Sequence, residues 1–151
     1  MRKGQASTEY LIILAVVIIV ALIVVGVMGW FPGLSSEITA DQSRAYWGAA
    51  SPFSITDFKV DTSGNAEFTL ENKLTDKLQL TEIALDGTSL SIDDANFTAG
   101  QSTTVNGSGV SDLCSNAGDT FSVEVTISYD NLEGVSGQSQ IGAKPLVGTC
   151  A

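Results

Sequence analysis

Few side chains in this chain of 151 residues are of types that carry out chemistry. It has no histidine, which removes the usual Ser-His-Asp and Cys-His arrangements and all histidine metal ligands. Its 17 carboxylates show no spacing that selects one pair for acid–base work. The acidic segments at Asp93-Asp94 and at residues 130–133 do not fit the calcium-loop pattern, and we expect solvated turns there. The sequence therefore predicts a protein that is not an enzyme and has no metal and no cofactor.

Two cysteines, Cys114 and Cys150, form the single pair available for a disulfide. If this part of the chain lies outside the cell, a bond between them is the expected use, and it would contribute on the order of 4 kcal/mol of stability in the chain-entropy model. The alternative is two unpaired buried thiols. A metal site at these two cysteines would lack further ligands, because the chain has no histidine.

Two N-x-[ST] motifs, Asn96-Phe97-Thr98 and Asn106-Gly107-Ser108, make Asn96 and Asn106 candidate N-glycosylation sites. Both fall in a turn-rich part of the chain. The motif is short and recurs by chance, so unmodified turn asparagines are the alternative. Phe97 is expected to anchor its loop.

The element that organises the chain is an apolar run at residues 11–31, which contains no charged residue. A helix of this length spans roughly 31 Å, close to the hydrocarbon thickness of a bilayer. Because it is apolar on all sides, it needs lipid or other helices around it. Arg2 and Lys3 precede the run and no cation follows it until Arg44, so we expect the N-terminus in the cytoplasm and the later residues outside.

The polar segment just ahead of the run, residues 2–11, reads RKGQASTEYL. It resembles the class III signal peptides of archaeal type IV pilins, whose mature N-terminus commonly reads Q-x-S-x-E-Y-L. The resemblance implies that a prepilin peptidase cleaves between Gly4 and Gln5, removes residues 1–4 and leaves the apolar helix on the mature protein.

Glu9 has two compatible interpretations, since a carboxylate near the start of a membrane helix is costly unless it is partnered or reaches the interface. On the residues alone, Glu9 lies in the first turn of a helix that Ser7 or Thr8 caps at the headgroups. The resemblance implies that Glu9 also pairs with the freed α-amino group of Gln5 on a neighbouring subunit, unless Gln5 cyclises. The residues thereby assigned to assembly are Gln5, Glu9, Tyr10 and Leu11.

Pro32, within the glycine-containing segment 29–33, predicts a bend in the helix, and the alternative is a helix that ends at Phe31. Beyond it, apolar residues recur at helical spacing and predict an amphipathic continuation to about Ala49. These residues are Leu34, Ile38, Ala45 and Ala49. Ser51-Pro52 ends this helix. Tyr46 and Trp47 are expected to pack its end onto the domain that follows.

From Phe53 onward the apolar period is that of β-strands. Residues 121–130 alternate apolar and polar positions most clearly, and residues 66–70 predict a second strand. Residues 78–85 change phase at Thr81-Glu82, which predicts a β-bulge. Weaker candidates are residues 54–60, 88–92, 103–106 and 136–141, and a last strand near Leu146.

Short strands of this number and spacing predict an antiparallel sandwich. The predicted fold class is α+β: a long N-terminal hydrophobic α-helix followed by an antiparallel, Ig-like β-sandwich head domain. The predicted organisation is a cleaved signal peptide at residues 1–4, a helix at 5–50 that is hydrophobic at 11–31 and then amphipathic, and the head domain at 51–151.

The resemblance and this layout predict the precursor of a major structural subunit of an archaeal type IV-like adhesion pilus. The precursor would lie in the cytoplasmic membrane and the mature protein in an extracellular filament. The implied partners are copies of the chain in a helical homopolymer, the prepilin peptidase, and a membrane assembly platform with its ATPase. The net charge of −10 argues against nucleic acid. The alternatives are a membrane-anchored binding module or minor pilin with the same signal, and an archaellin, which the Q-x-S-x-E-Y-L start disfavours.

Overall fold

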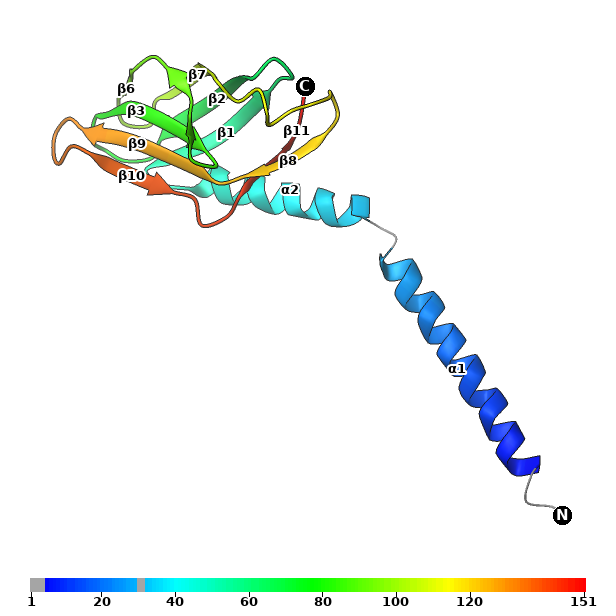
Figure 1. The fold of residues 1–151 in the computed structure, drawn as a ribbon. Helices are drawn as coiled ribbons and strands as arrows, with labels where there is room; N and C mark the ends of the chain where they lie inside the picture. Colours follow the sequence, from blue (N-terminus) through cyan, green and yellow to red (C-terminus); the bar gives the residue numbers. More distant parts are fainter. Residues whose placement is uncertain (1–4, 30–31) are drawn as a thin grey trace. The chain divides into compact units, whose positions relative to one another are not determined.

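A computed structural model describes residues 5–29 and 32–151 of the chain. They divide into two compact units, Met1–Ile38 and Thr39–Ala151, and we call the second unit the head. The first unit contains helix α1 (Gln5–Gly29) and the beginning of helix α2 (Pro32–Ala49). The head contains the rest of α2 and all the strands in the described part of the chain (Figure 1). The fold class is α+β, as predicted.

Helix α1 confirms the predicted apolar helix. Its segment Ser7–Val24 is long and apolar enough to cross a membrane, with a mean hydropathy of 2.7. The predicted bend at residues 29–33 includes residues 30 and 31, which lie outside the described residues. On either side of them, α1 ends at Gly29 and α2 begins at Pro32. Proline suits the first position of a helix, because the N–H that it lacks would have no partner within the helix there.

Helix α2 ends at Ala49, as predicted, but its contact face differs from the one that the apolar spacing indicated. The residues that α2 and its C-terminal end bury in the head are Ser43, Trp47 and Ala50, whereas Ala45 and Ala49 are exposed. A buried indole removes far more apolar surface from water than an alanine does, so Trp47 determines which side of the helix faces the head.

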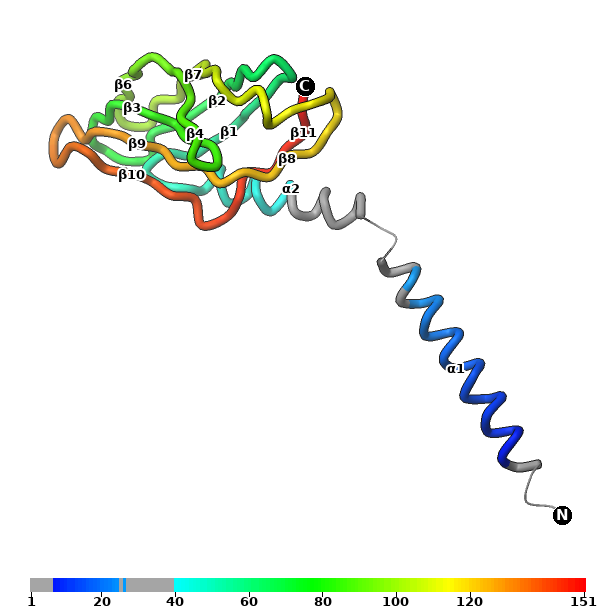
Figure 2. Tube along the Cα trace, in the orientation of Figure 1, coloured from blue at the N-terminus to red at the C-terminus, as the bar shows by residue number. Residues whose placement is uncertain are grey.

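The strands of the head form three sheets in which every pairing is antiparallel. The first sheet has the order β1 (Phe53–Val60), β2 (Asn65–Asn72), β7 (Ser102–Ser108), β5 (Ser91–Ile92). The second has the order β10 (Gln138–Ile141), β9 (Val125–Asn131), β3 (Leu78–Leu85), β4 (Thr88–Ser89), and β6 (Ala95–Phe97) also pairs with β3. The third joins β11 (Leu146–Thr149), red in Figure 2, to β8 (Thr120–Val123).

Two predicted strands are divided between sheets. The predicted strand at residues 121–130 is interrupted at Glu124, where the chain leaves β8 and enters β9 in another sheet. Asp86 lies beside this break: its N–H donates to the Glu124 carbonyl at 2.9 Å, and its carboxylate accepts from the Glu124 N–H at 2.7 Å. The predicted strand 88–92 likewise splits into β4 and β5, which belong to different sheets.

The bulge predicted at Thr81-Glu82 is confirmed, since the register between β3 and β9 shifts between Leu80 and Glu82. A second register shift lies in β1, between Ile55 and Asp57, and the sequence gave no sign of it. Strand β6 was also not predicted.

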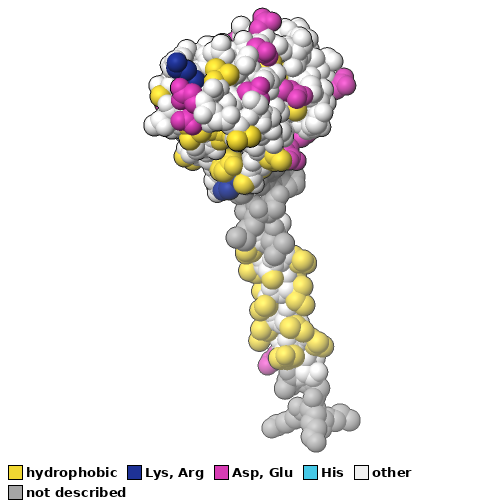
Figure 3. All heavy atoms as spheres, turned by 90° about the vertical axis from the view of Figure 1, so that its left-hand side faces the viewer, with side chains coloured by type: hydrophobic (Ala, Val, Ile, Leu, Met, Phe, Trp, Pro, Cys, Tyr) yellow, Lys and Arg dark blue, Asp and Glu magenta, His cyan; other side chains and the backbone are white. Residues whose placement is uncertain are grey.

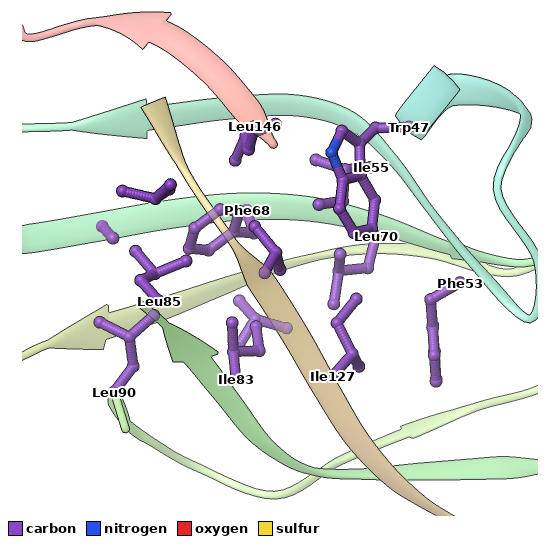
Figure 4. Packing of buried hydrophobic residues seen from close by; sticks show 14 of the residues in the cluster. Trp47, Phe53, Ile55, Phe68, Leu70, Ile83, Leu85, Leu90, Ile127 and Leu146 are labelled. Carbon is purple, nitrogen blue, oxygen red and sulfur yellow. The ribbon is translucent and has the colours of Figure 1, made fainter. Parts of the chain in front are cut away.

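The core is formed by side chains from all three sheets and includes Trp47 from α2 (Figure 4). The largest fully buried side chains are Trp47, Phe53, Phe68, Phe97, Leu70, Leu78, Leu80, Ile83, Ile127, Leu146, Val60 and Val123. The Phe53 ring packs edge to face against Phe97 and Tyr129, with ring centroids 5.2 and 5.6 Å away. Burial raises the pKa of Tyr129 above its usual value.

The side chain of Gln140 in β10 connects two strands that do not pair with each other. Its Oε1 accepts from the Phe53 N–H at 2.9 Å, and its Nε2 donates to the Phe53 carbonyl at 2.8 Å. Both hydrogen bonds are buried, and only 8% of Gln140 is exposed. The amide thus provides β1 with the hydrogen bonds that a neighbouring strand would otherwise supply.

Replacing Gln140 by leucine should lower the free energy of unfolding by about 2 kcal/mol, because the Phe53 N–H and carbonyl would remain buried without partners. The measurement is denaturant unfolding of the full chain in mild detergent, followed by near-ultraviolet circular dichroism. Ser139→Ala, at an exposed position of the same strand, is the control and should change the stability by less than about 0.5 kcal/mol. Equal effects of the two variants would contradict this role of Gln140.

Candidate functional site

The first candidate site is the surface of α1. The large apolar side chains from Tyr10 to Val24 are exposed on every side of the helix, from 42% for Leu14 to 67% for Tyr10 and Leu22. Figure 3 shows apolar side chains along the described part of this helix. Glu9 is the only charged residue in the segment Ser7–Val24. A surface of this kind is stable only in lipid or against other apolar helices.

The N-terminal motif lies at the start of α1. The predicted cleavage residue Gly4 lies outside the described residues, and Gln5 is the first residue of α1. Ser7 and Thr8 therefore lie inside the first turn and do not cap the helix, and Glu9 follows that turn, so the predicted cap is wrong. Gln5 and the alanine that follows it are good helix formers, which explains the earlier start. Glu9, Tyr10 and Leu11 are exposed.

The second candidate site is the place where α2 packs against the strands and loops of the head, and it confirms the role predicted for Tyr46 and Trp47. Trp47 is fully buried, and the Tyr46 hydroxyl accepts a hydrogen bond from the Ala143 N–H at 2.8 Å. Ser43, which the sequence did not indicate, donates to the Pro145 carbonyl at 2.8 Å and accepts from the Val147 N–H at 2.9 Å. Helix α2 is therefore held by β11 and the loop before it.

Cys114 and Cys150 form the predicted disulfide, with their Cα atoms 5.7 Å apart. Both cysteines are buried. Cys150 follows β11, and its N–H donates to the Asp119 carbonyl at 2.7 Å, while its own carbonyl accepts from the Gly118 N–H at 2.9 Å. The bond thus fixes the end of β11 to the loop between β7 and β8.

The two candidate glycosylation asparagines lie on different strands, and both are exposed. Asn96 lies in β6 opposite Gln79, and Asn106 lies in β7 opposite Glu67. Phe97, beside the first of them, is buried in the core, which confirms that it anchors its segment. Exposure makes both asparagines accessible to modification.

No cluster of metal-ligating side chains occurs in the described part of the chain. Asp93 and Asp94 are exposed between β5 and β6, and the Asp130 carboxylate accepts from the Gly137 N–H after β9. The Asn131 side chain accepts from the Glu133 N–H at 2.9 Å in the turn after β9. A similar turn follows β1, where the Asp61 carboxylate accepts from the N–H groups of Ser63 and Asn65 and from the Asn65 side chain. These hydrogen bonds, chiefly that from the Asn65 side chain, lower the pKa of Asp61.

A cleft between α2 and β1 was not predicted. It has a volume of about 100 Å³, and its lining residues are Arg44, Trp47, Gly48, Ile55, Thr56, Asp57 and Phe58. The register shift of β1 falls on its wall, between Ile55 and Asp57. The sequence gave no signal for the cleft, because it depends on how α2 crosses a locally irregular strand.

No protein-family model matches this chain, and no curated protein matches it. The function is therefore inferred from the residues and from the geometry of the described units.

Proposed function

We propose that this chain is the precursor of a structural subunit of an archaeal type IV-like adhesion pilus. One observation carries the proposal: α1 begins with a Q-x-S-x-E-Y-L motif, and its large apolar side chains from Tyr10 to Val24 are exposed on every side. A helix with such a surface needs apolar surroundings, which lipid supplies to the precursor and copies of the same helix supply in a filament.

Processing and assembly would proceed in two environments. The precursor lies in the cytoplasmic membrane with its N-terminus inside and the head outside. A prepilin peptidase then removes residues 1–4, including Arg2 and Lys3, and the helix loses the side-chain charges that hold its N-terminus at the lipid surface. Glu9 pairs with the new α-amino group of Gln5 on a neighbouring subunit, and Tyr10 and Leu11 pack beside them. An assembly platform with an ATPase drives this step, because leaving lipid for other helices gives little hydrophobic gain.

The same proposal assigns the head to the Ig-like β-sandwiches and makes it the outer coat of the filament. Its support is the pair of antiparallel sheets around one core, together with the crossing of the chain between sheets at Glu124. The disulfide fits an extracellular location, because such bonds persist in oxidising surroundings.

The test determines two things: the first residue of the mature protein, and whether this protein is a component of the surface filaments. We expect mass spectrometry of sheared surface filaments to find a main component that begins at Gln5, and electron microscopy to show that the filaments contain it. Gly4→Leu should retain residues 1–4 and abolish the filaments, because the peptidase site would carry a bulky side chain. Glu9→Gln should still be processed and should reduce filament yield by at least about tenfold, through loss of a charged pair in an apolar setting.

Asp41→Asn, which removes an exposed carboxylate from α2, is the matched control and should form normal filaments. A processed protein that remains in the membrane fraction and enters no filament would refute the pilin proposal. It would instead favour a membrane-anchored binding module. A mature chain that begins at Met1 would refute the signal peptide as well.

A further inference from the structure

The turn between β9 and β10 exposes apolar side chains at one end of the head. Among the described residues of the head, the exposed large apolar side chains are Leu74, Leu132, Val135 and Ile141. Leu132 and Val135 lie in this turn and are 52% and 69% exposed, and Leu74 lies in the loop between β2 and β3. We call the surface formed by Leu74, Leu132 and Val135 the apolar tip.

Hydrogen bonds hold the apolar tip in a defined shape. The Asn131 N–H donates to the Val135 carbonyl at 3.3 Å, which closes the turn. The Leu132 N–H donates to the Lys77 carbonyl at 2.9 Å, and the Asn131 side chain donates to the Asp76 carboxylate at 2.9 Å, so the two loops are joined. Burying exposed aliphatic side chains of an ordered backbone costs little further ordering, which favours docking to a partner.

A hollow toward the other end of the head has an apolar floor, and we call it the β3–β8 hollow. Its volume is about 190 Å³, and its apolar lining residues are Leu85, Val110, Leu113 and Val123. Strand β3 runs from Leu78, beside the apolar tip, to Leu85 in the hollow, and its 8 residues span roughly 25 Å. Figure 1 shows the turn between β9 and β10 at one end of the head and β8 toward the other. One copy therefore cannot place its own tip in its own hollow.

Charges at the two surfaces favour contact between them. Asp86 and Asp112 are exposed at the β3–β8 hollow, and none of the described residues that line it is a cation. Lys77, beside the apolar tip, is exposed and forms no ion pair within the described residues. Glu133 in the same turn is also exposed, and its charge offsets part of this attraction. Apolar contact therefore supplies most of the binding, and the charges orient it.

We propose that the apolar tip of one copy of this chain binds in the β3–β8 hollow of a second copy. A second copy is the partner because every chain carries both halves of the contact, a projecting apolar turn and an apolar hollow rimmed by carboxylates. The two halves differ and lie at opposite ends of the head, so the contact repeats head to tail and generates an open chain of heads. This polarity suits a filament, and that part of the inference rests on the proposed function.

The first arm of the test cross-links the full chain in detergent micelles and does not depend on filaments. Val135→Cys chains are mixed with Thr88→Cys chains, since Thr88 is exposed at the hollow, and the mixture is mildly oxidised. We expect the mixed dimer to form at least about tenfold faster than with Ser102→Cys chains, whose cysteine is exposed on β7 outside the hollow. A chain that carries both Val135→Cys and Thr88→Cys should form a ladder of multimers, as an open head-to-tail contact requires.

A change within the tip tests the apolar contact itself. Leu132→Ser in the Val135→Cys chain should slow the cross-linking to Thr88→Cys chains, because it removes apolar surface from the tip. Ile141→Ser is the matched control, since Ile141 is an exposed aliphatic side chain of the same head outside the tip, and it should leave the rate unchanged.

Val135→Cys chains that join Thr88→Cys chains no faster than Ser102→Cys chains would overturn the proposal. Val135→Cys chains that join each other as fast as they join Thr88→Cys chains would overturn it as well. The second arm compares the dissociation temperatures of filaments in detergent, where Leu132→Ser filaments should dissociate at a lower temperature than Ile141→Ser filaments.

If the specific cross-link forms but these two kinds of filament are equally stable, the contact between copies stands and its place in the filament is excluded. If the protein enters no filament, the proposed function fails, and the cross-linking still decides whether the heads bind head to tail.

Discussion

Replacing Cys114 and Cys150 together by serine is expected to lower the free energy of unfolding of the head by about 4 kcal/mol. The disulfide closes a span of 36 residues, and the chain-entropy model assigns about this value to a loop of that length. Denaturant unfolding of the full chain in mild detergent measures the effect.

Unmodified protein treated with a reductant provides the control, since it loses the bond without a change of sequence. It should lose nearly the same stability as the double serine variant. A loss below about 1 kcal/mol in both samples would mean that the hydrogen bonds of Cys150 and the pairing of β11 with β8 already hold this end of the head.

Gly142→Ala should destabilise the head by roughly 3 kcal/mol, the upper part of the range for overpacking a core. A methyl group at Gly142 would overlap the six-membered ring of Trp47, which is fully buried. The same unfolding measurement applies. Gly48→Ala is the matched control: Gly48 is exposed in α2 with open space around its Cα, so alanine should stabilise the helix by about 0.5–1 kcal/mol.

A double variant tests the assigned cause. Trp47→Phe removes the part of the ring that the new methyl would meet, so Gly142→Ala should cost much less in that background than in the native protein. Equal costs in the two backgrounds would show that the strain arises elsewhere, for example in the loop between β10 and β11.

Local sequence patterns predicted the elements whose cause is local. The apolar run predicted α1, the phase change at Thr81-Glu82 predicted the bulge in β3, and the single cysteine pair predicted the disulfide. The prediction that Trp47 packs onto the head also held, because so large an apolar side chain is costly to expose beside a folded domain.

What the sequence did not predict depends on partners far along the chain. The sequence did not single out Ser43 or Gln140, and each is buried and bonds to backbone groups about a hundred or ninety residues away. Apolar and polar residues alternate through residues 121–130 in the same way whether a strand stays in one sheet or crosses to another. The sequence therefore gives no sign of the strand break at Glu124. The cleft at Trp47 could not be predicted for a similar reason, since it depends on how α2 crosses the irregular strand β1.

The attachment of α2 to the far end of the chain determines how the head carries mechanical load. Ser43 and Tyr46 bond to the loop before β11 and to β11 itself, and Cys150 ties the end of that strand covalently to Cys114. A pulling force that enters through α2 therefore passes into β11 and then into a covalent cross-link. Tension along the helix thus reaches the head at two places, through the backbone into β1 and through these hydrogen bonds into β11.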